Sequence, residues 1–138
     1  MIIMKKFILD EDGQAVVEFA IIAPIILLIL CGIIDFSWIF SAQLATNNCA
    51  REGARYASVS SSYSTLEYDT SQKVLSVATD NIKENIETAV VLSNTTNPSS
   101  GDVTVTITSE IKTLTIVANT IFGGNTAKLS SSVTMKVG

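Results

Sequence analysis

The sequence places a glycine and a carboxylate at the start of a long apolar run. Gly13 lies just before the run, and Glu18 lies five residues further on, inside it. A carboxylate at the bilayer centre costs on the order of 3 kcal/mol in a spanning helix, so its presence needs a reason. Glu18 either lies hydrated near the cytoplasmic interface or has a partner. Cleavage after Gly13 would supply one, because the new amine of Gln14 would pair with a Glu18 carboxylate of the same or a neighbouring chain and fix the axial register.

Composition limits the other kinds of chemistry. The chain has no histidine, which excludes Ser-His-Asp and Cys-His catalysis and histidine-containing metal sites. Cys31 and Cys49 would be roughly 27 Å apart in one helix, too far to bridge each other. Residues 41–138 carry seven Lys and Arg against eight Asp and Glu, a balance that disfavours nucleic acid as a partner. We therefore expect no catalytic residue, no metal and no cofactor, and a membrane-tethered enzyme is the least favoured hypothesis.

The apolar run is long enough to cross a membrane. Residues 15–34 would span about 30 Å as a helix, which matches the hydrocarbon core of a bilayer. A cleaved secretory signal is the rival, but the run leads into Asp35 and Trp38 without a small-residue cleavage site. Lys5 and Lys6 precede the run, so we expect the N-terminus in the cytoplasm and the C-terminal part outside.

Helical signals continue beyond the membrane. Phe36, Phe40 and Leu44 fall on one stripe, and no proline follows Pro24 until Pro98. The outer part of this helix is rich in Ala and Gly, which let another element approach its backbone closely. We expect a leader peptide at 1–13, one helix at 14–58 with a transmembrane half at about 15–38, and an outer domain at 59–138.

The outer domain combines helix and strand patterns. Apolar residues at steps of four predict a second helix from about Thr70 to Val91. Strict alternation predicts a strand over 102–108 and another over 126–137, paired antiparallel. Residues 112–122 fit neither period cleanly and stay open between strand and helix. The expected fold is α+β and pilin-like, with a long N-terminal helix continuing into a helix packed on an antiparallel sheet.

Three more residues of the long helix are candidates for packing and assembly. Pro24 has no amide hydrogen, so the helix should kink or loosen there. Arg51 and Arg55 are one turn apart, and a solvated ion-pair face with Glu52 is their default role. Small residues beside them favour a second role, in which they lock the helix to the outer domain or to a neighbour through Glu110 or backbone carbonyls.

These segments resemble the TadE-like family of minor pilins or pseudopilins from tight-adherence (Flp) pilus systems. The resemblance rests on GQAVVEFAIIAP at 13–24, on the apolar run leading to Gly32–Phe36, and on AREGARYA at 50–57. It implies that a prepilin peptidase cleaves between Gly13 and Gln14 on the cytoplasmic side and recognises Glu18. Phe19 stands where pilins of these systems often have Tyr.

Two functions follow as hypotheses. In the first, the chain is a single-pass protein of the cytoplasmic membrane that, once processed, assembles into or primes a type IV-like pilus. Its partners would be the peptidase, other pilin subunits, the assembly platform and membrane lipid, and its outer domain is large enough to favour a minor subunit. The alternative is a stably anchored binding module that is neither processed nor assembled.

Overall fold

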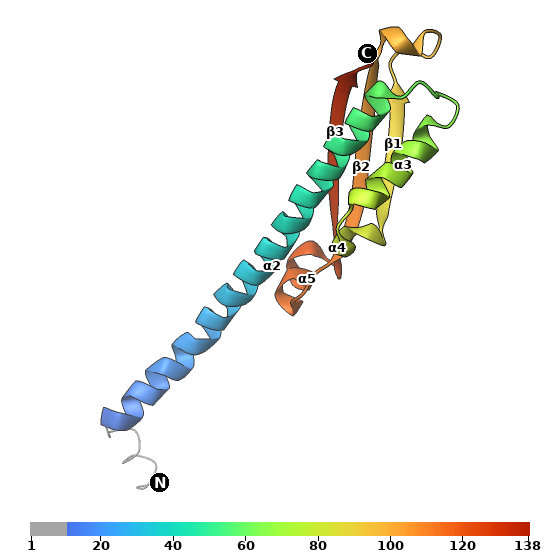
Figure 1. Ribbon diagram of the computed structural model, residues 1–138. Coiled ribbons are helices and arrows are strands. Elements are labelled where there is room, and N and C mark those ends of the chain that lie inside the picture. Colours follow the sequence, from blue (N-terminus) through green and yellow to red (C-terminus); the bar gives the residue numbers. More distant parts are fainter. Residues whose placement is uncertain (1–10) are drawn as a thin grey trace.

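The computed structural model describes residues 11–138, leaving aside the side chains of residues 11, 12, 121 and 122. A long helix leads into a small outer domain of helices and a three-stranded antiparallel sheet (Figure 1), so the expected α+β class is confirmed. In chain order the elements are α2 (Glu11–Val59), α3 (Leu66–Val77), α4 (Asp80–Lys83), β1 (Ile86–Leu92), a 3-10 turn (Pro98–Ser100), β2 (Asp102–Lys112), α5 (Ile116–Phe122) and β3 (Thr126–Lys136).

The sheet is a meander in the order β1-β2-β3, with both pairs antiparallel. Val105 at its centre is opposite Val90 on one side and Val133 on the other. Strand residues alternate between two faces, so one face of β2 is fully buried and the other is partly exposed. The buried face packs on α2, and α3 lies beside α2 (Figure 1).

Small residues bring the outer half of α2 close to the rest of the domain. Ala50, Ala54 and Ala57 have no exposed surface. A Cβ atom added to Gly53 would lie 2.9 Å from Val74 Cγ2 of α3 and 3.2 Å from Val105 Cγ1 of β2. The close approach predicted from the small residues is therefore confirmed, and the element that approaches is the chain's own domain.

The second helix is shorter than predicted. It ends at Val77, a short turn of helix follows at Asp80–Lys83, and Ile86–Leu92 is a strand instead of the last turns of a helix. Ala78 takes an extended conformation with ψ 135°, which ends α3. Residues four apart lie on one side of a strand as well as on one side of a helix, so the apolar spacing that predicted a helix also fits β1.

The C-terminal half follows the predicted strands. β2 is longer than expected, and it pairs with β3 from Asp102 opposite Lys136 to Lys112 opposite Thr126, which confirms the antiparallel pairing. Residues 112–122, which stay open between strand and helix in the sequence, are mostly helical in the structure, because β2 ends at Lys112 and α5 begins at Ile116.

Candidate membrane-anchoring and assembly site

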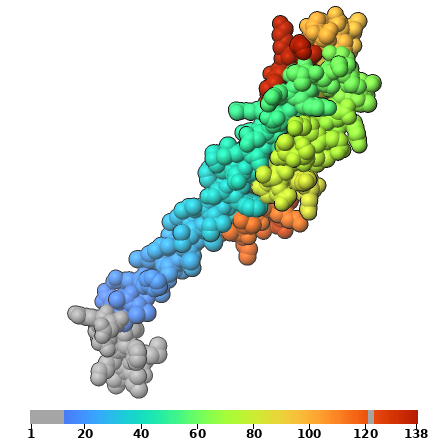
Figure 2. Space-filling model, viewed as in Figure 1, coloured from blue at the N-terminus to red at the C-terminus, as the bar shows by residue number. Residues whose placement is uncertain are grey.

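Most of the N-terminal half of α2 is exposed among the described residues. α2 is long and apolar enough to cross a membrane, and its most apolar window has no buried residue. Figure 2 shows this half standing clear of the outer domain. The surface of residues 15–34 is therefore left for lipid or another helix, as a single-pass anchor requires.

The expected processing site lies in the first turns of α2. The helix begins at Glu11, three residues earlier than expected, so Gly13 and Gln14 are already helical. Gln14 Nε2 donates a hydrogen bond to Glu18 Oε1 at 3.2 Å, and Phe19 beside it is 68% exposed. The rest of the expected leader, residues 1–10, lies outside the described residues.

Pro24 lies in the middle of the apolar half. The helix continues through it without a break (Figure 1), although proline cannot donate the hydrogen bond that residue 20 would accept. The kink or loosening expected at Pro24 remains a prediction.

Asp35 joins the long helix to the far end of the chain. Its side chain is buried, and Oδ1 accepts hydrogen bonds from the backbone N–H groups of Leu114 and Thr115, both at 3.0 Å. The Thr115 hydroxyl donates to Oδ2. Three donors on one carboxylate make charge-assisted hydrogen bonds, which are the stronger kind. Asp35 therefore fixes the segment just ahead of α5 against α2, where the apolar run ends.

Trp38 strengthens the same junction. Its Nε1 donates to the carbonyl oxygen of Lys112 at 3.2 Å, and its ring is half-buried against the core. This hydrogen bond connects α2 to the end of β2. Sequence reasoning missed both contacts because their partners lie more than 70 positions along the chain.

An apolar stripe continues along α2 beyond Asp35. Phe36, Phe40 and Leu44 are 71%, 55% and 50% exposed, and the rings of Phe36 and Phe40 stack with centroids 6.2 Å apart. The expected stripe is thus found on the outside of the helix. Exposed apolar residues in a contiguous row mark an interaction surface.

Arg51 and Arg55 point into solvent. Arg55 lies 3.9 Å from Glu52, and the two side chains are 75% and 43% exposed. The expected partner Glu110 is on the sheet face turned away from α2, because alternation along β2 buries Ser109 and exposes Glu110. Among the described residues neither arginine has a hydrogen bond outside its own helix, so a lock within the chain is not found. A contact with a neighbouring subunit remains a prediction.

The two cysteines occupy different surroundings. Both are free thiols on α2. Cys49 is 1% exposed in the domain core, and this burial raises the pKa of its thiol. Cys31 is half-buried within the apolar half. Cys49 is therefore a small residue of the domain core.

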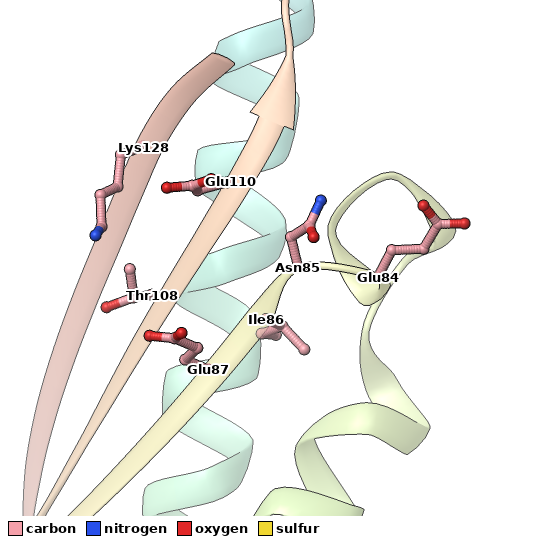
Figure 3. Close-up of a pocket in the computed structure, with 7 residues that line it drawn as sticks. All are labelled: Glu84, Asn85, Ile86, Glu87, Thr108, Glu110 and Lys128. Atoms are coloured by element: carbon pink, nitrogen blue, oxygen red, sulfur yellow. The ribbon is translucent and has the colours of Figure 1, made fainter.

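A charged hollow of about 290 Å³ lies at the end of the sheet near α4 (Figure 3). Glu110 and Lys128 are opposite each other in the pairing of β2 and β3, and Glu87 is opposite Thr108. All three glutamates of this hollow are exposed and solvated. Within residues 11–138 no cluster of His, Cys, Asp or Glu was found that could hold a metal ion. The hollow is lined by Glu84, Asn85, Ile86, Glu87, Thr108, Glu110 and Lys128.

The candidate processing, anchoring and packing residues thus lie along one helix, and a family comparison covers the same stretch. Residues 13–55 match the family model described as TadE-like protein. This segment of the chain is similar to TadE-like proteins. The resemblance expected from the sequence is confirmed, and it indicates a pilin-like protein associated with the Tad pilus. Curated proteins and solved structures gave no match.

The TadE-like match ends before the outer domain is complete. It covers the apolar half of α2 and most of the small-residue half, and it stops at Arg55. α3, the sheet and α5 lie outside it. What is TadE-like in this chain is therefore the helix and its packing surface.

Proposed function

We propose that the chain is a pilin-like subunit that is anchored by α2, processed after Gly13, and then assembled with other subunits through the same helix. The observation that carries the proposal is the continuous exposed apolar surface of α2. This surface covers the span and goes on through Phe36, Phe40 and Leu44, where the chain's own domain leaves it open. A stable anchor needs only the span, whereas a subunit that packs against other helices needs the outer stripe as well.

The TadE-like match supports processing because it begins at Gly13. In the uncleaved chain Glu18 accepts a hydrogen bond from the Gln14 side chain one turn away. After cleavage the α-amine of Gln14 would become a second and charged donor near the same carboxylate. Away from water such an amine–carboxylate pair is stronger than at the surface, and pairing with a neighbour's Glu18 would fix the axial register of two subunits.

Processing is tested by the mass of the mature chain. Intact-mass analysis of protein from cells with and without a prepilin peptidase should show a chain beginning at Gln14 only when the peptidase is present. Gly13→Leu should leave the N-terminus at Met1 in both strains. Gly32→Leu is the matched control, because Gly32 lies in the same helix with no atom within 4 Å of an added Cβ, and it should be processed normally.

An N-terminus at Met1 in both strains would contradict the proposal and leave the alternative, a stably anchored binding module. Processing that Gly13→Leu does not prevent would contradict the assignment of the cleavage site.

A further inference from the structure

An exposed apolar segment lies at the end of the outer domain nearest the membrane-spanning half. Leu114 is 56% exposed and Ile116 is 82% exposed. Both belong to residues 112–116, here called the foot segment, which runs from the last residue of β2 to the first residue of α5. Figures 1 and 2 show α5 as the part of the outer domain that extends furthest along α2 toward its N-terminus.

The position of the foot segment relative to the bilayer is fixed by Asp35. Residues 15–34 account for about 30 Å of helix, the thickness of a hydrocarbon core, so Asp35 lies at the outer edge of that core. The backbone N–H groups of Leu114 and Thr115 are 3.0 Å from Asp35 Oδ1. The foot segment therefore lies at the level where hydrocarbon meets headgroups.

The residues around the foot segment suit that level. Trp38 is hydrogen-bonded to the carbonyl of Lys112, and Lys112 itself is exposed. Tryptophan is enriched at membrane interfaces, and a lysine can keep its ammonium among headgroups while its stem covers apolar surface. Aliphatic side chains beside them would face the acyl boundary.

We propose that the foot segment is a second membrane contact, in which Leu114 and Ile116 enter the outer lipid interface while α2 crosses the bilayer. The partner is the lipid surface, because the segment is hydrogen-bonded to Asp35, where the span ends. This inference rests on the proposed anchoring by α2. With two attachment points the outer domain is held in one orientation about the helix before assembly, and assembly must withdraw the foot segment from lipid.

Spin-label accessibility in vesicles tests the contact. The full chain with Cys31→Ala and Cys49→Ala is labelled at one introduced cysteine and reconstituted in vesicles of phosphatidylcholine and phosphatidylglycerol. Ile116→Cys reports the foot segment, Ile26→Cys reports the span, and Val59→Cys is the matched control. Val59 is 72% exposed but lies at the far end of α2, roughly 37 Å beyond the span.

Collision with oxygen measures contact with lipid, and collision with a water-soluble nickel chelate measures contact with water. The ratio of the two at position 116 should be several-fold higher than at position 59 and closer to that at position 26, and Leu114→Cys should behave in the same way. A water-like ratio at 116 with a lipid-like ratio at 26 would overturn the inference and leave the anchor intact. A water-like ratio at 26 would overturn both. Shielding of 116 from both reagents would mean that protein covers the foot segment, which also overturns a lipid contact.

Discussion

Replacing Gly53 by alanine should destabilise the outer domain, although the same change stabilises most helices. Glycine inside a helix costs about 1 kcal/mol relative to alanine, so backbone propensity alone favours the substitution. Here the added Cβ would meet Val74 Cγ2 at 2.9 Å and Val105 Cγ1 at 3.2 Å, in a core where Val74 has no exposed surface. Overpacking of this kind costs about 1 to 3 kcal/mol. We expect a net loss of about 1 kcal/mol.

A double-mutant cycle separates the clash from other effects. Val74→Ala removes the closer of the two methyl groups that the new Cβ would meet, so Gly53→Ala should become neutral or stabilising in that background. The coupling free energy should fall between about 1 and 3 kcal/mol, as expected for residues in contact.

The assay is guanidinium unfolding of the full chain in detergent micelles, followed by the fluorescence of Trp38. This is the chain's single tryptophan, and its indole donates to the Lys112 carbonyl, so it reports release of the domain from α2. Stabilisation by Gly53→Ala in the wild-type background would refute the packing argument. So would an equal effect of Gly53→Ala in both backgrounds.

Three further predictions concern α2. Asp35→Asn should speed hydrogen exchange of the backbone amides of Leu114 and Thr115, which donate hydrogen bonds to the carboxylate. Ser37→Ala, at an exposed position of the same helix, should leave their exchange unchanged. Thr46→Val should cost about 1 to 3 kcal/mol in chemical unfolding by leaving the buried Ser109 hydroxyl unpaired; Ser109→Ala should cost less, because Thr46 keeps its bond to a backbone carbonyl. The Cys49 thiol should resist a water-soluble maleimide until the domain unfolds, because burial and a raised pKa keep it protonated, and labelling at neutral pH in the folded state would contradict this.

The sequence predicts those elements whose hydrophobic pattern is compatible with only one kind of secondary structure. The long helix, β2 and β3 follow from an uninterrupted apolar run and from strict alternation, which fit a single period. The helix predicted over the residues of β1 was wrong. Ile86 and Val90 are four positions apart, and this spacing places two side chains on one side of a helix or of a strand. The connection between α3 and β1, residues 78–85, has no Gly or Pro that would mark the end of a helix in the sequence.

Long-range contacts of the candidate site could not be predicted in this way. Asp35 reads locally as the polar end of a span, and nothing near it in the sequence indicates that its partners are Leu114 and Thr115. Glu110 was proposed as a partner of the arginines without knowledge of the strand register, and the register places it on the opposite face. The small-residue surface was predictable because Ala and Gly at helical spacing permit close approach, whichever element fills it.

Photo-crosslinking from the outer stripe of α2 tests the assembly role most directly. Phe40 is replaced by the photo-crosslinking residue benzoylphenylalanine in cells that make the pilus system. Illumination should give an adduct with another subunit, which mass spectrometry identifies as a protein with an apolar helix preceded by glycine. The adduct should form only when the prepilin peptidase is present. Tyr68, 66% exposed on α3, is the control position and should not give that adduct. Absence of such an adduct at Phe40, or equal yields with and without the peptidase, would contradict a subunit that assembles through α2.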